Sequence, residues 1–154
     1  MGSRSAVCLV DEWVLRDGLR TGFLRRVPGD CGVAVSSLTH AWLSGSLESD
    51  AGPRLEVRAW LSGCGIKVVA ATALELAEVE SWLPSGVFSA GQVESLALVR
   101  SRGMGYCTEE GLVVEWLRER GLGDRVVRLE ELVRRVSEGA VRSRRDRWRR
   151  LRLR

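Results

Sequence analysis

Short apolar segments recur along this sequence, and longer segments with helix-like spacing of their apolar residues separate them. The apolar segments are too short for stable helices, so they predict buried strands. Strands that alternate with helices favour a parallel sheet with helices on both faces. We therefore expect an α/β fold, a three-layer α/β/α arrangement around a central, mostly parallel sheet of about five strands. The predicted strands are Ala6–Asp11, Gly32–Val35, Ile66–Ala70, 104–108 and Arg125–Leu129, and the predicted helices are 12–27, Ser36–Leu47, Pro53–Leu61, Thr72–Leu83, 90–102, 111–121 and a last one from Glu130.

The end of the chain is much more basic than the rest. Residues 142–154 hold eight arginines and one aspartate, a net charge of +7, which leaves −3 for the remainder of a chain whose total is +4. We expect an α/β domain over 1–130 and a C-terminal helix with an Arg-rich tail over 131–154. Such a tail favours binding to a polyanion, RNA or DNA. A disordered solubilising end and a partner-binding helix are the alternatives.

Composition bounds the compartment and the source. With 45% hydrophobic and 29% charged residues, the 154-residue chain reads as an ordinary globular domain. No apolar run approaches the ~20 residues that cross a membrane, and the N-terminus lacks a signal-like stretch, so we expect a cytoplasmic protein. The chain has no asparagine and one glutamine. That depletion is compatible with a thermophile, although a GC-rich genome would give the same excess of arginine over lysine.

The four cysteines show neither a CxxC pair nor a histidine at ligand spacing, which disfavours structural zinc. We expect buried free thiols. In a hyperthermophile, a bridge between Cys31 and Cys64 is the alternative.

Acidic residues stand at three points where the predicted elements meet. Asp11 ends the first strand, Glu94 lies on the apolar side of helix 90–102, and Glu109 and Glu110 follow the strand 104–108. The carboxyl ends of parallel strands form the ligand-binding edge of open α/β sheets, and a buried carboxylate needs compensation. The pattern favours a cation site. The alternative is a solvated glutamate on the helix and a polar loop.

Four segments stand out in order along the chain: AVCLVDEWVL (6–15), VSSLTHAWLSGS (35–46), SAGQVESLALV (89–99) and YCTEEG (106–111). Together they resemble the motifs of the PIN domain, a metal-dependent nuclease family. The first is similar to the family's first strand with its acid, and the second to the form V-S-x-I-T-x-A-E-L-x-x-G. The third is similar to S-x-G-E-A-E-A-L-A-L-A and the fourth to L-T-D-D. The resemblance covers about residues 5–130.

The resemblance implies a site in which clustered carboxylates hold Mg²⁺ or Mn²⁺ and cut RNA phosphodiesters. Hard divalent cations take oxygen ligands, and the metal activates water and stabilises charge on the phosphate. On this reading the catalytic residues are Asp11, Glu94 and Glu110. The metal ligands are Asp11, Glu94, Glu109 and Glu110, with Glu12 able to fill in.

The sequence departs from the family's pattern at three places. Trp42 stands at the glutamate of the second motif, Gln92 replaces another acid, and the last motif has glutamates for aspartates. Two hypotheses follow: a Mg²⁺- or Mn²⁺-dependent ribonuclease, or a catalytically degenerate module that binds RNA or a protein partner. The resemblance also raises a toxin of a toxin–antitoxin pair, with an antitoxin as partner. A homodimer is a further expected form of assembly.

Overall fold

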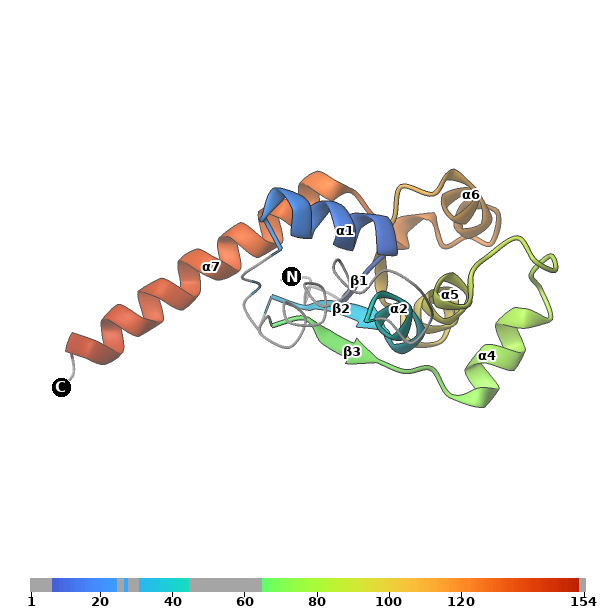
Figure 1. Ribbon diagram of the computed structural model, residues 1–154, viewed down its shortest axis with the longest axis horizontal. Coiled ribbons are helices and arrows are strands. Elements are labelled where there is room, and N and C mark those ends of the chain that lie inside the picture. The colour runs from blue at the N-terminus through green and yellow to red at the C-terminus, as the bar shows by residue number, and fades with distance from the viewer. Residues whose placement is uncertain (1–6, 25–26, 28–30, 45–64, 153–154) are drawn as a thin grey trace.

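The computed structural model describes residues 7–24, 27, 31–44 and 65–152. Five parallel strands form one sheet in the order β3-β2-β1-β4-β5 (Figure 1). Helices cover both faces of that sheet. The predicted three-layer α/β/α fold with a five-stranded parallel sheet is therefore confirmed. The strands are β1 (Cys8–Val10), β2 (Val33–Ser36), β3 (Lys67–Val69), β4 (Gly105–Cys107) and β5 (Val126–Val127).

The helices are α1 (Glu12–Thr21), α2 (Ser37–Leu43), α4 (Ala73–Glu80), α5 (Ala90–Arg102), α6 (Gly111–Glu119) and α7 (Leu129–Arg152), with a 3₁₀ turn over Gly123–Arg125. Among these helices, none combines the length and apolar character needed to cross a bilayer.

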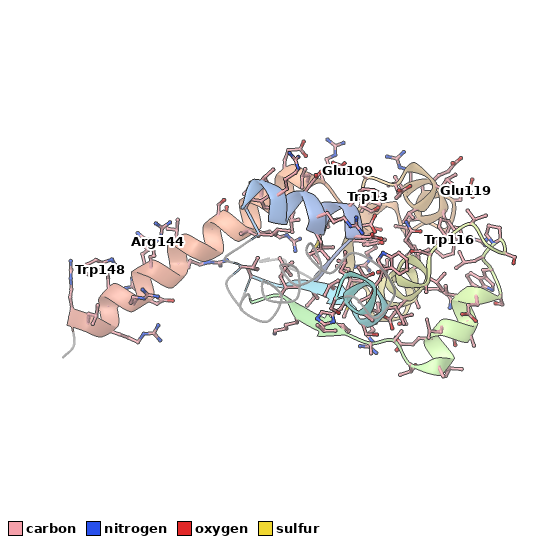
Figure 2. The ribbon with its side chains drawn as sticks, in the orientation of Figure 1. Trp13, Glu109, Trp116, Glu119, Arg144 and Trp148 are labelled. Atoms are coloured by element: carbon pink, nitrogen blue, oxygen red, sulfur yellow. The ribbon has the colours of Figure 1, made fainter. Side chains whose placement is uncertain are left out.

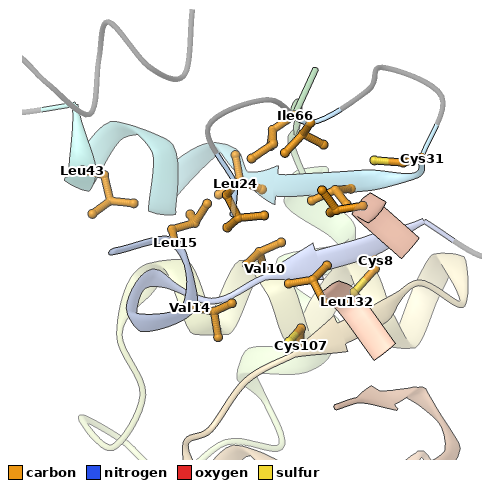
Figure 3. Close-up of a cluster of buried hydrophobic side chains, with 14 residues drawn as sticks. Cys8, Val10, Val14, Leu15, Leu24, Cys31, Leu43, Ile66, Cys107 and Leu132 are labelled. Atoms are coloured by element: carbon orange, nitrogen blue, oxygen red, sulfur yellow. The ribbon is translucent and has the colours of Figure 1, made fainter. Parts of the chain in front are cut away.

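Alternate residues of the strands pack into two separate hydrophobic cores, because successive strand side chains point to opposite faces. Cys8 and Val10 of β1 pack with α1 and with Leu132 of α7 (Figure 3). Leu9, between them, packs on the other side with residues of α4, α5 and α6. The central strands are thus buried on both faces, which explains why their sequences are continuous apolar runs.

The observed elements are shorter than predicted at several ends. Helix α1 stops at Thr21, not at residue 27, because Gly22 takes a left-handed conformation with φ of 86° and caps the helix. Strand β5 has two residues in place of the predicted five, since the 3₁₀ turn occupies Gly123–Arg125. The predicted helix Pro53–Leu61 lies outside the described residues.

Helix α7 joins the domain to the Arg-rich end without a break. Leu132 and Val136 in its first half are buried in the core. The helix then leaves the domain and extends beyond it toward the C-terminus, at the left of Figure 1. We call its distal half, residues 141–152, the arginine arm. The boundary at residue 130 stays a prediction, and the described end of the chain is helical.

The start of α4 gives a testable pH dependence. Thr72 and Glu75 form a capping box, and the Glu75 carboxylate also accepts hydrogen bonds from Arg102 at 2.7 Å and from the Ser101 hydroxyl. The Arg102 contact, followed by the Ser101 contact, lowers the pKa of Glu75 from 4.5 to about 2. A carboxyl whose pKa falls on folding stabilises the protein above the unfolded pKa, and that contribution is lost as the pH falls toward the folded pKa.

We therefore expect Glu75→Gln to lower the free energy of unfolding by about 1 kcal/mol at neutral pH and to have almost no effect near pH 2. Urea denaturation across this pH range measures it. Glu80→Gln, on the same helix, is the matched control. An equal loss at both ends of the range would contradict the assignment.

Candidate functional site

Asp11 lies where β1 ends and α1 begins, at the carboxyl edge of the sheet. It is the N-cap of α1, and its Oδ1 accepts a hydrogen bond from the Glu12 amide at 2.8 Å. Its carboxylate also accepts from the hydroxyls of Thr108 at 2.8 Å and Tyr106 at 3.3 Å. Burial, followed by the charge of Asp11, raises the pKa of Tyr106 well above its usual range, so the phenol stays a donor. The side chain of Asp11 is 3% exposed and makes three hydrogen bonds within the protein.

Glu94 of α5 is also 3% exposed, and its carboxylate faces the first turn of α2. It accepts hydrogen bonds from the Ser37 hydroxyl at 2.8 Å, the Leu38 amide at 2.9 Å and the Ala71 amide at 3.3 Å. The positive end of a helix dipole and its unpaired amides stabilise an anion at this place. Glu94 therefore ties α5 to the start of α2 and to the segment after β3.

Glu109 and Glu110 follow β4 at the same edge. The Glu109 side chain is exposed, and Glu110 is half-buried at the start of α6, where it makes no side-chain cap. The Glu110 amide donates to Oγ1 of Thr108 at 3.1 Å, and that hydroxyl donates to Asp11. The structure thus links the backbone at Glu110 to Asp11 through Thr108. Sequence reasoning missed Thr108 and Tyr106, although both lie in the segment that carries the last acidic motif.

A pocket of about 410 Å³ opens at this edge, between the start of α1, helix α2 and the start of α5. Trp42 is half-exposed, and its indole Nε1 donates to Glu12 at 3.0 Å. Glu12 also pairs with Arg16 at 2.8 Å. The position where the family motif has an acid thus carries an indole that contacts an acid. The lining residues are Asp11, Glu12, Leu38, Thr39, Ala41, Trp42, Ser89, Ala90 and Gly91.

Gly91 and Gln92 shape the wall of this pocket. A Cβ on Gly91 would collide with Oγ1 of Thr39 and approach its backbone to 3.2 Å, so only glycine lets α5 come this close to α2. Gln92 closes a capping box with Ser89 at the start of α5: its Oε1 accepts from the Ser89 amide at 3.0 Å. The residue at the second departure from the acidic motif therefore has a helix-capping role.

The acids predicted to bind metal do not all face the same place. Asp11 lines the pocket, whereas the carboxylate of Glu94 is directed to donors on α2 and after β3. Across the described ranges, no group of three or more His, Cys, Asp or Glu side chains is placed to hold a metal ion. A hard cation needs several oxygen ligands that converge. The Mg²⁺ or Mn²⁺ site that the resemblance implies therefore stays a prediction.

Two buried thiols lie in the sheet below the site, Cys8 at the start of β1 and Cys107 at the end of β4. Burial raises the pKa of Cys8 to about 11 and that of Cys107 to about 12, so both stay protonated and unreactive at neutral pH. They match the expected buried free thiols. Cys64, one half of the alternative Cys31–Cys64 bridge, lies outside the described residues.

The arginine arm is the second candidate site. It carries seven arginines and one aspartate, a net charge of +6, and its Trp148 is 65% exposed. Arg145, Trp148, Arg149 and Arg152 line a shallow hollow along the helix. Figure 2 shows Arg144 and Trp148 on the projecting helix, away from the domain. Guanidinium groups beside an exposed indole suit a phosphate backbone with unstacked bases.

A comparison with known protein families finds none that matches the sequence, and a comparison with curated proteins finds no match either.

Proposed function

We propose that this chain is a PIN-like RNA-binding protein in which two acids of the family's nuclease site, Asp11 and Glu94, have become structural. The observation that carries the proposal is the arginine arm, a helix that leaves the domain with a net charge of +6 and an exposed Trp148. The order of the four motifs supports the PIN-like part. The hydrogen bonds of Glu94 to α2 support the loss of catalysis.

Binding of this kind depends on phosphate neutralisation. Each arginine that meets a phosphate releases a condensed counterion, so affinity falls as salt rises. Single-stranded RNA exposes both its phosphates and its bases. Trp148 offers a face on which a base can stack, with arginines on the adjacent turns of the same helix. The arm therefore favours single-stranded RNA without sequence preference.

Titration of a labelled single-stranded RNA by fluorescence anisotropy at several salt concentrations tests the proposal. With four to six phosphate contacts we expect log K to fall with log salt with a slope of about −3 to −4. A duplex of the same length serves as the comparison. Binding that does not change with salt would remove the arm from the account.

A metal-dependent ribonuclease is the second candidate, because Asp11 lines the edge pocket beside Glu12 and its partner Thr108 leads to Glu110. A nuclease assay on structured and unstructured RNA with Mn²⁺ tests it. The RNA-binding proposal expects no cleavage by the wild type. Cleavage that Asp11→Asn abolishes, in a variant that still unfolds cooperatively, would favour the ribonuclease instead. The toxin role and an antitoxin partner remain predictions.

A further inference from the structure

The two candidate sites are opposite in charge. At the carboxyl edge, four acids lie around the 410 Å³ pocket or on the segment that hydrogen-bonds into it, and we call them the acidic edge: Asp11, Glu12, Glu109 and Glu110. Large apolar side chains are exposed on the elements that start at this edge: Trp13, Leu38, Trp42 and Leu112. An exposed apolar surface next to a pocket commonly marks a binding site. Its negative charge favours a cationic occupant.

The arginine arm has the complementary character. Val141, Trp148 and Leu151 are all exposed, and spacings of seven and three residues place them on one face of the helix. Arg145 and Arg152 are at i−3 and i+4 from Trp148, so they flank the same face. Twelve helical residues span about 18 Å, enough to lie across an edge pocket. An amphipathic helix in a groove is a common mode of recognition.

Within one molecule the arm and the acidic edge do not meet. Figure 2 shows Arg144 and Trp148 on the projecting part of α7, well separated from Trp13 and Glu109 on the domain. The helix leads away from the sheet along its whole distal half (Figure 1). Contact between the two charged surfaces therefore requires a second copy of the chain.

We propose that the arginine arm of one copy docks on the acidic edge of another. Trp148 enters the pocket beside Trp42, and the flanking arginines pair with Glu12, Glu109 and Glu110. The contact is head to tail, because the arm and the edge are different surfaces. Such contacts close into rings or continue as chains. The docking goes beyond RNA binding and does not depend on it.

RNA and a second copy compete for the same arm. Because RNA occupies the arm's arginines, a saturating single-stranded RNA releases the docked copies. By linkage, docking weakens RNA binding by the same factor.

A mixing experiment with full-length variants tests the docking. The arm variant carries Trp148→Ser and Arg152→Gln, and the edge variant carries Trp42→Ser and Glu109→Gln. Glu80→Gln, an exposed acid on α4, is the control. Sedimentation velocity at ~50 mM and ~500 mM salt measures the assembly, since screening at the higher salt weakens charge pairs at the surface. Circular dichroism verifies that each variant is folded.

We expect the wild type and Glu80→Gln to associate at low salt and to dissociate at high salt. Each of the two other variants alone is monomeric, with at least a tenfold weaker association. An equal mixture of the two forms a 1:1 dimer and nothing larger, because it contains one intact arm and one intact edge per pair. A wild type that is monomeric at low salt overturns the proposal. So does association of either variant alone at the wild-type level, or a mixture that stays monomeric.

Discussion

Replacing Glu94 with glutamine is expected to lower the free energy of unfolding by about 3 kcal/mol, since a buried charged acceptor with several donors contributes ~1.5–3 kcal/mol per bond. The carboxylate has its two oxygens directed at the Ser37 hydroxyl and at the amides of Leu38 and Ala71. A glutamine retains one acceptor oxygen. Its NH₂ group then faces donors, so a buried N–H loses its partner.

Equilibrium urea denaturation of the two proteins measures the loss. Glu115→Gln, at an exposed position of α6, is the matched control and should change stability by less than about 0.5 kcal/mol. The result separates two roles for Glu94. If Glu94 served only as a metal ligand among other acids, removing its charge would relieve repulsion, and stability would stay the same or rise. An equally or more stable Glu94→Gln would therefore contradict the structural role.

Neutralising three arginines of the arm is expected to weaken single-stranded RNA binding by about a hundredfold at low salt, because each lost phosphate contact removes a charge-assisted hydrogen bond and a released counterion. The variant replaces Arg145, Arg149 and Arg152 by glutamine, the residues that line the hollow with Trp148. The salt slope should become shallower by about 2. Titrations at several salt concentrations measure both quantities.

The control for this variant changes net charge by the same amount elsewhere. Arg20, Arg118 and Arg128 are exposed on the domain, and their replacement by glutamine should alter affinity by less than about threefold, through long-range attraction alone. If the two triple variants lose affinity equally, net charge and not the arm determines binding. The arm would then have no special role in RNA recognition.

The strands could be predicted from local sequence, because each is an apolar run bounded by polar or turn residues. β1 is buried on both faces, so Cys8, Leu9 and Val10 are all apolar, and nothing in its pattern is ambiguous. β5 was predicted too long. Its two residues are only partly buried, and the preceding residues form a 3₁₀ turn in place of extended strand. That choice depends on how α6 packs, which local pattern does not reveal.

The positions of the acidic residues could be predicted from the sequence, but the directions of their carboxylates could not. Their positions at strand ends and on α5 were predicted, and the structure places Asp11 and Glu110 at one edge through Thr108. The direction of each carboxylate was not predictable. It depends on the donors that other elements bring, and those of Glu94 come from residues 57, 56 and 23 positions away along the chain.

The sequence by itself determined the layers, the parallel sheet and the separation of a mildly acidic domain from a basic end, since these follow from apolar periodicity and from counting charges. Tertiary structure alone decided which acids serve as structural anchors and which line a pocket. It also decided that the basic end is a helix projecting away from the acidic edge. Hydrogen-bond partners and distances between charged surfaces depend on residues far apart in the sequence, and only packing brings them together.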